Sequence, residues 1–255
     1  MQQPNYQKYA QYYDHFELAG FEESEELNDF LDELFDLNSV KSVIDFSCGT
    51  GAQSIGLARK GYEVTAADIN PAMLKLAKAK AAKLSARKLK FTQADMRTCR
   101  LGVYDAAISI FNAIGHLTKA ECADFFANAF NHLVDGGLFV TDILNFTALQ
   151  QGVFEQYSHF SREIADGDCL IQHARQSELD EHDRVITIRS TTRFQDGVSA
   201  PKSVEDCWQM QIYDRKELES MLRDAGFAEI MVFSAAGAPF EECDSDNILL
   251  VSQKP

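Results

Sequence analysis

A glycine-containing turn between two short apolar segments, within residues 42–70, restricts this chain to few folds. The segment predicts a strand, a turn, a helix and a second strand: Ser42–Phe46, Gly49 to Gly51, Ala52–Lys60, and a strand that ends at Asp68. Such a unit opens a doubly wound α/β sheet, in which ligands bind at the carboxyl ends of the strands. We therefore expect a ligand close to the two glycines.

The ligand at this turn is expected to be a nucleoside. A side chain at Gly49 or Gly51 would block the close approach of the backbone to a ligand. Asp68, at the end of the second strand, is placed to accept hydrogen bonds from the two hydroxyl groups of a ribose.

Charge at the turn separates two kinds of nucleoside ligand. A dinucleotide fingerprint has glycine or alanine at its third position and seats a pyrophosphate on the helix N-terminus, whereas this chain has Ser54 there. Asp45, just before the turn, would repel a pyrophosphate but suits a ligand that carries an amino group and a sulfonium. Both residues oppose a nicotinamide-dependent reductase, and Asp45 favours S-adenosylmethionine.

Residues 45–51 follow the pattern D-x-x-C-G-T-G and resemble the first motif of the class I S-adenosylmethionine-dependent methyltransferases. The resemblance implies a doubly wound, seven-stranded and mostly parallel sheet of the Rossmann-like methyltransferase type. It also implies that the cofactor is contacted by Asp45, Cys48, Gly49, Gly51 and Asp68. In this turn Cys48 is expected to be a small packing residue rather than a nucleophile.

Four further cofactor contacts are expected, and the first two follow from the resemblance. Asp95 and Met96, after the expected strand Leu89–Ala94, match the pair with which the family reads the amino edge of adenine, although Asp95 could instead cap a turn. Met73 is expected to pack on the adenine or in the core. Ile69 directly follows the acid that is expected to bind the ribose.

The loop after the fourth expected strand, Tyr104–Ile110, narrows the resemblance. The sequence I-F-N-A-I-G-H-L resembles the loop of amino-sugar N-methyltransferases and, more loosely, that of glycine N-methyltransferases. It lacks the prolines of nucleic-acid amino methyltransferases. The resemblance implies Phe111 as an aromatic wall and His116 as a base, since a histidine can take a proton from an amine or orient its nitrogen. Alternatively, His116 only hydrogen-bonds the loop backbone or caps the next helix.

An N-terminal helix is expected over Asn5–Ala19, where Tyr6, Tyr9, Tyr13 and Phe16 fall on one face. In the family that the chain resembles, this segment lies over the cofactor, and tyrosine hydroxyls reach the methionyl carboxylate or the substrate. That makes Tyr9 an expected cofactor contact and Tyr13 a catalytic candidate. Simple packing of the aromatic stripe on the sheet explains the same pattern.

Composition limits the partners. The formal net charge of −15 disfavours nucleic acid and anionic membranes, because both require clustered Lys and Arg. No apolar run approaches the ~20 residues of a membrane span, and no signal-peptide pattern opens the chain. The six cysteines are scattered, which indicates neither a zinc site nor a disulfide framework. We expect a small-molecule substrate, no metal, and a cytoplasmic location.

Alternation of apolar and polar residues between Glu163 and Tyr213 predicts a small antiparallel insertion that caps the substrate cleft. Its edge could instead pair with a second copy in a homodimer. We expect four parts: an N-terminal helical lid (1–38), the S-adenosylmethionine-binding core (39–150), the antiparallel insertion (151–213), and a C-terminal helix and hairpin that complete the core sheet (214–255).

The sequence therefore predicts a methyltransferase that moves a methyl group from S-adenosylmethionine to a small molecule by in-line displacement. Nitrogen is preferred to oxygen as the acceptor because of the loop and His116. Two alternatives stay open: an O-methyltransferase on a hydroxylated metabolite, and a non-catalytic nucleoside-binding or scaffold protein.

Overall fold

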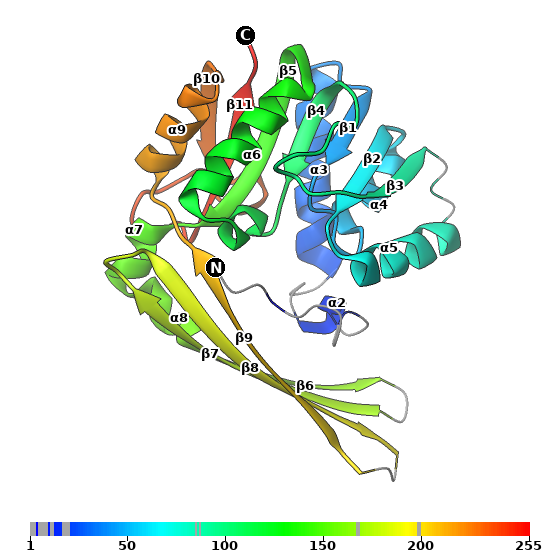
Figure 1. Ribbon diagram of the computed structural model, residues 1–255, viewed down its shortest axis with the longest axis vertical. Coiled ribbons are helices and arrows are strands. Elements are labelled where there is room, and N and C mark those ends of the chain that lie inside the picture. The colour runs from blue at the N-terminus through cyan, green and yellow to red at the C-terminus, as the bar shows by residue number, and fades with distance from the viewer. Residues whose placement is uncertain are drawn as a thin grey trace.

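The computed structural model describes residues 4, 10, 13–16, 21–84, 86, 88–166, 169–197 and 200–255. In this part of the chain a seven-stranded sheet has the strand order β10-β11-β5-β4-β1-β2-β3 (Figure 1), which confirms the expected doubly wound fold. Strands β1 to β5 pair in parallel, and β11 pairs antiparallel with β5 and β10. The bounds are β1 Ser42–Asp45, β2 Glu63–Asp68, β3 Leu89–Gln93, β4 Tyr104–Ser109, β5 Leu133–Leu144, β10 Glu229–Phe233 and β11 Asn247–Gln253.

Helices cover both faces of this sheet. Helices α6 and α9 bury an aromatic and aliphatic cluster on one face, and α3, α4 and α5 pack on the other. Because hydrophobic side chains of every strand point to one face or the other, two cores form around one sheet. No helix among the described residues is long and apolar enough to cross a membrane. The bounds are α3 Phe21–Leu37, α4 Ala52–Lys60, α5 Pro71–Lys83, α6 Lys119–Asn131 and α9 Arg215–Asp224.

Short helices complete the core and its connections. They are α2 Tyr13–Phe16, η2 Ala113–His116, α7 Phe146–Ala148, η3 Leu149–Val153, α8 Phe154–Ser158 and η4 Ala235–Gly237. Helix α2 is the described part of the expected N-terminal helix, and the rest of that expectation, including Tyr9, lies outside the described residues.

Local signals explain where the long helices begin. The Asn70 side chain accepts hydrogen bonds at the start of α5, which has Pro71 in its first turn. Thr118 and Glu121 form a reciprocal capping box at the start of α6. The sequence predicts a helix from about Lys119 to Leu133 that is stopped by Asp135 to Gly137, and this prediction was wrong. Helix α6 ends at Asn131, and Asp135 to Gly137 lie inside β5, at a bulge in its pairing with β4. Glycine suits this bulge because a Cβ at Gly137 would lie 2.9 Å from a backbone oxygen.

The antiparallel insertion forms a second sheet, in the order β6-β7-β8-β9, that projects from the core (Figure 1). The alternating pattern predicts three strands here, over Cys169–Leu179, Val185–Phe194 and Cys207–Tyr213. Strand β6 is additional, and β9 begins earlier than this pattern indicates, at Lys202. Phe160, Arg162 and Ile164 share one face of β6, and the exposed arginine between the two apolar side chains interrupts the apolar pattern there. The bounds are β6 His159–Asp166, β7 Cys169–Asp180, β8 Val185–Asp196 and β9 Lys202–Gln211.

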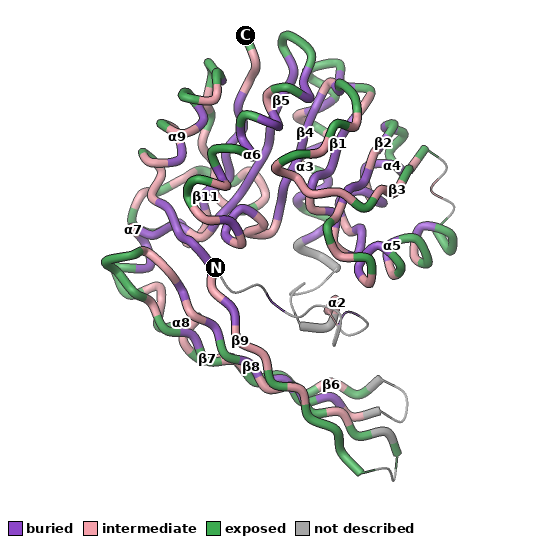
Figure 2. The backbone as a smooth tube through the Cα atoms, viewed as in Figure 1, coloured by how far each residue is buried: buried purple, intermediate pink, exposed green. Residues whose placement is uncertain are grey.

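The root of this second sheet is part of the main core, whereas its outer end is largely exposed (Figure 2). Four buried side chains at the root, two from β8 and two from β9, join the same apolar cluster as Ile114 and Leu117 of the loop after β4: Ile186, Ile188, Trp208 and Met210. The second sheet therefore packs directly against the segment that carries His116.

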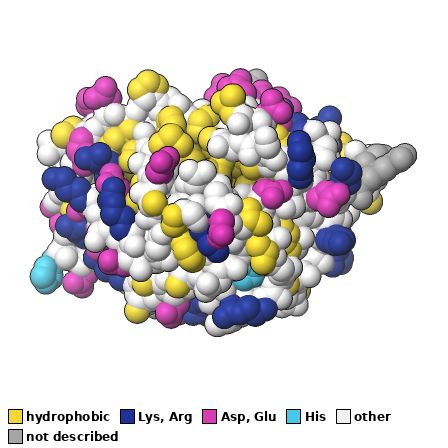
Figure 3. Space-filling model, turned by 90° about the horizontal axis from the view of Figure 1, so that it is seen from above, with side chains coloured by type: hydrophobic (Ala, Val, Ile, Leu, Met, Phe, Trp, Pro, Cys, Tyr) yellow, Lys and Arg dark blue, Asp and Glu magenta, His cyan; other side chains and the backbone are white. Residues whose placement is uncertain are grey.

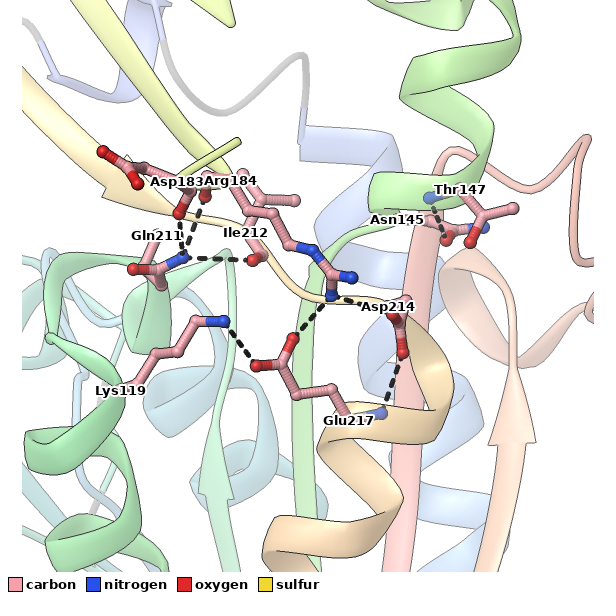
Figure 4. Close-up of polar contacts among 9 residues, drawn as sticks. All are labelled: Lys119, Asn145, Thr147, Asp183, Arg184, Gln211, Ile212, Asp214 and Glu217. Carbon is pink, nitrogen blue, oxygen red and sulfur yellow. Dashed lines mark hydrogen bonds and ion pairs between the residues drawn. The ribbon is translucent and has the colours of Figure 1, made fainter. Parts of the chain in front are cut away.

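A charged cluster also fastens the second sheet to the core (Figure 4). Arg184, in the β7–β8 turn, lies 2.8 Å from both Asp214 and Glu217 at the start of α9. Its guanidinium lies 4.7 Å from the ring centre of Phe146. Lys119 of α6 contacts Glu217 at 2.5 Å. This cluster ties the β7–β8 turn, α6 and α9 to one another.

Candidate cofactor and active site

A cavity of about 530 Å³ opens at the carboxyl ends of β1 to β4. Ten of the residues expected from the sequence line it: Tyr13, Cys48, Gly49, Asp68, Ile69, Met73, Asp95, Met96, Phe111 and His116. Asp45 and Gly51 do not line it, although they adjoin residues that do. The volume is within the range of ligand pockets, roughly 300–1,000 Å³.

The glycine turn has the backbone that its sequence suggests. Gly49 and Gly51 have φ angles of 50° and 92°, a region that side chains disfavour. A Cβ at Gly51 would lie 3.0 Å from Ile55 and 3.2 Å from Ala77, so this glycine allows the turn to pack on α4 and α5. A Cβ at Gly49 would have no atom within 4 Å. Space for a ligand therefore lies directly over Gly49.

Asp68 links the turn to the next helix. Its Oδ2 accepts a hydrogen bond from the backbone N–H of Gly49 at 2.8 Å, and its Oδ1 accepts one from that of Asn70 at 2.7 Å. Burial raises the pKa of the Asp68 carboxyl, and these two N–H groups oppose that rise. Each oxygen has a further lone pair, which leaves acceptor capacity toward the cavity.

Asp45 lies beneath the turn, where it is buried. Its Oδ2 accepts a hydrogen bond from Ser54 at 2.5 Å, and its Oδ1 accepts one from the backbone of Ser47 at 3.2 Å. Burial raises the pKa of Asp45 to about 7. The carboxyl is thus only partly charged at neutral pH, which weakens the electrostatic argument drawn from it. From the sequence, Ser54 was only a mismatch to the dinucleotide fingerprint. Its hydrogen bond to Asp45 was not predicted.

An ion cluster lines the far side of the cavity. Arg97 lies 2.6 Å from Asp95 and also contacts Glu121 of α6. Hydrogen bonding from Arg97 lowers the pKa of Asp95. The backbone oxygen of Met96 accepts a hydrogen bond from Asn128 at 2.8 Å, which fixes this segment against α6. Sequence reasoning missed Arg97 and Glu121; the only signals were the D-M-R tripeptide and the T-K-A-E capping box.

His116 and Tyr13 line the cavity and come from two different short helices, η2 and α2. His116 ends the short helix η2, and burial lowers its pKa to about 4, so that its imidazole is neutral at physiological pH. Tyr13 lies on α2. The next residue, Asp14, accepts a hydrogen bond from Thr50 in the glycine turn at 2.5 Å and also contacts Lys80 of α5. Helix α2 is therefore held over the turn.

The lining suits S-adenosylmethionine. Three carboxylates, those of Asp68, Asp95 and Glu121, face one guanidinium, that of Arg97. An excess of negative charge favours a cationic sulfonium. Apolar side chains of Ile69, Met73, Met96 and Phe111 are available for the adenosyl moiety. Among the described residues, no group of three or more His, Cys, Asp and Glu side chains is arranged to hold a metal ion.

Comparisons with known proteins agree with this geometry. The family model described as a methyltransferase domain matches residues 43–137. The YqeM protein of Bacillus subtilis (strain 168), described as a methyltransferase, is 29% identical over 188 residues, 72% of this chain and 72% of that protein. A glycine/sarcosine N-methyltransferase of Parasynechococcus marenigrum (strain WH8102) is 32% identical over 128 residues, 49% of this chain and 45% of that protein.

A solved structure has the same fold along nearly the whole chain. A crystal structure of an S-adenosylmethionine-dependent methyltransferase from Clostridium acetobutylicum ATCC 824 superposes with a TM-score of 0.81 and 18% sequence identity, and covers 98% of each chain. The matched domain includes the glycine turn, Asp68, Asp95 and Phe111, which meet at the cavity. Residues 43–137 therefore form a methyltransferase domain by sequence, and the chain as a whole has the fold of an S-adenosylmethionine-dependent methyltransferase.

Proposed function

We propose that this enzyme methylates an amine nitrogen of a small molecule. The observation that carries the proposal is the acidic lining of the cavity, in which Asp68, Asp95 and Glu121 outnumber Arg97. A negative lining attracts an acceptor amine, which is cationic in solution, as well as the sulfonium donor. The partial match to a glycine/sarcosine N-methyltransferase supports the same choice.

In-line transfer from a sulfonium requires alignment of donor and acceptor more than acid–base chemistry. When bound, S-adenosylmethionine supplies the methyl group. We assign its methionyl end to Cys48, Gly49 and Tyr9, and its ribose to Asp68 and Ile69. Its adenine is assigned to Met73, Asp95 and Met96, with Phe111 as a wall. Asp45 and Gly51 act indirectly in this proposal, since they shape the turn without lining the cavity.

The low proton affinity of His116 changes its proposed role. A base whose conjugate acid has a pKa of about 4 removes protons poorly from ammonium or hydroxyl groups. We therefore assign His116 to orienting the acceptor nitrogen, together with Tyr13. An amine that is drawn to the cavity as a cation can pass its proton to water before the methyl transfer, whereas an alcohol or phenol has to lose its proton during the transfer itself. This difference favours nitrogen over oxygen.

The acceptor can be identified by a screen. Purified enzyme and S-adenosylmethionine are incubated with amines, catechols and hydroxy acids, and release of S-adenosylhomocysteine is measured, with reactions that lack the acceptor as the background. We expect turnover with amines. Turnover confined to catechols or hydroxy acids would support the O-methyltransferase alternative, and cofactor binding without any turnover would support a non-catalytic role. Calorimetry with S-adenosylmethionine, S-adenosylhomocysteine and NAD should show binding of the first two alone.

Two further proposals concern partners. On the face in Figure 3, acidic and basic side chains are interspersed, and with the net charge of −15 this supports a small molecule over nucleic acid as the substrate. A homodimer through the edge of the second sheet, at β6, is a separate proposal that light scattering of the purified protein tests. A monomeric mass at micromolar concentration would reject it.

A further inference from the structure

The loop that follows β4 has an unusual backbone where it enters the cavity. Phe111 and Asn112 are adjacent, and their φ angles are 62° and 58°. The left-handed region is unfavourable for an L-residue, and it is rare for a bulky side chain such as phenylalanine. Two such residues in succession persist only where their surroundings enforce the conformation.

The end of β5 supplies those surroundings. Oδ1 of Asp142 accepts a hydrogen bond from the backbone N–H of Asn112 at 2.9 Å. In return, Oδ1 of Asn112 accepts one from the backbone N–H of Leu144 at 2.7 Å. Asn247 of β11 lies 3.4 Å from the other oxygen of Asp142 through its Nδ2. The loop is thus held from behind by two neighbouring strands.

Asp142 is buried, with 7% of its surface exposed, and it does not line the cavity. Phe111 and His116, which belong to the loop, do line it. Burial raises the pKa of Asp142 to about 6, and the hydrogen bonds from Asn112, Asn247 and the Phe111 backbone limit that rise. The carboxyl is therefore mostly ionised at neutral pH, and its donors come from the loop, at Phe111 and Asn112, and from Asn247 of β11.

We propose that Asp142 is a positioning residue for the cofactor site: it holds Phe111 and Asn112 in their left-handed conformation and so sets the Phe111 ring against the bound donor. The inference concerns cofactor binding and does not depend on which acceptor is methylated. It assigns to Asp142 an effect that passes through Phe111 rather than through direct contact with the cofactor.

A double-mutant cycle tests this path. Calorimetry measures the affinity of the full-length chain for S-adenosylmethionine in the wild type, Asp142→Ala, Phe111→Ala and the double variant. We expect each single change to weaken binding by about tenfold, as for the loss of one aromatic contact. The double variant should bind about as well as Phe111→Ala alone. Additive losses, of about a hundredfold, would overturn the proposal, as would wild-type affinity in either single variant.

Thr141→Val is the matched control, because Thr141 is buried on the same strand and donates only to the Ser109 carbonyl, at 3.0 Å. It should lower the thermal midpoint while S-adenosylmethionine affinity stays within about twofold of wild type. A tenfold loss in this control would show that any damage to β5 weakens binding, which also overturns the proposal. If Asp142→Ala does not fold, Asp142→Asn replaces it in the cycle. Non-additivity with a smaller effect is then expected, and additivity again contradicts the proposal.

Discussion

Asp68 carries two structural hydrogen bonds and faces the cavity, so its charge has two functions. Asp68→Asn keeps the shape of the side chain but replaces one carboxylate oxygen with an NH2 group. The hydrogens of this group would face the backbone N–H of Gly49 or of Asn70, where the oxygen accepts a hydrogen bond in the wild type. We expect S-adenosylmethionine affinity to fall by about 10- to 100-fold, the value of one or two hydrogen bonds to a charged group. Calorimetry measures the loss. Asp135→Asn, at an exposed carboxylate of β5, should bind normally; equal losses in both variants would contradict a specific role.

Asp45 should make the protein without bound cofactor less stable as the pH rises. Its pKa is about 7 in the folded chain and near 3.8 when unfolded, so the folded state binds more protons between these values. The free energy of unfolding therefore falls with pH across this window, by on the order of 1.4 kcal/mol per pH unit at most. Asp45→Asn removes this contribution. Relative to wild type, the variant should gain stability from about pH 4 to pH 7 in urea denaturation.

Other groups do not obscure this comparison. Burial lowers the pKa of His116 and of His173 to about 4, so their contribution to stability is lost as the pH falls below ~6.5. Both histidines are present in the wild type and the variant, and their effect cancels in the difference. Asp105→Asn is the control: burial opposes the shift, but hydrogen bonds from Lys41 and Ser42 lower the pKa of Asp105. Asp105 therefore changes the free energy of unfolding only below about pH 4. A flat difference for Asp45→Asn would contradict the prediction.

Among the secondary-structure elements, those read from the sequence were the ones with local signals. The glycine turn, the acid at the end of β2 and the caps of α5 and α6 each depend on residues within a few positions of one another. By contrast, Arg97 reaches Glu121 across 24 positions, and Asp142 reaches Asn112 across 30. No spacing rule identifies such pairs, because the fold alone brings the segments together.

The short helix η2 is held tightly between two strands. A Cβ at Gly115 would lie 2.9 Å from Cδ1 of Ile143 and 3.3 Å from the backbone oxygen of Gln211. Gly115→Ala should therefore destabilise the protein by about 1–3 kcal/mol through overpacking. Ile143→Val removes the atom that clashes, although it costs about 0.5–1.5 kcal/mol by itself. The double variant should be more stable than the sum of the two single effects predicts.

Urea denaturation of the four proteins measures this coupling. Ile108→Val is the control partner for Gly115→Ala, because Ile108 is buried in the core on the opposite face of the sheet. Its effect should add to that of Gly115→Ala. Simple additivity with Ile143→Val as well would show that η2 has room to shift, and would contradict the close packing.

For the molecule as a whole, the second sheet and the doubly wound core should unfold together. Trp208 is the only tryptophan of the chain and lies buried at the root of the second sheet, within the main apolar cluster. Because that cluster spans both sheets, loss of either exposes apolar surface of the other. We expect the urea transitions followed by tryptophan fluorescence and by far-ultraviolet circular dichroism to coincide, as in a two-state process.

Arg184 tests whether the junction carries this cooperativity. Arg184→Met removes the contacts with Asp214 and Glu217 and the packing on Phe146, and it should lower both transitions together by about 1–2 kcal/mol. Arg189→Met is the matched control, since Arg189 pairs with Glu178 on the exposed face of the same sheet. That change should leave both transitions where they are in the wild type. If fluorescence reported an earlier transition than circular dichroism in the wild type, the second sheet would be an independent unit. Its packing against η2 could then not set the position of His116 during the reaction.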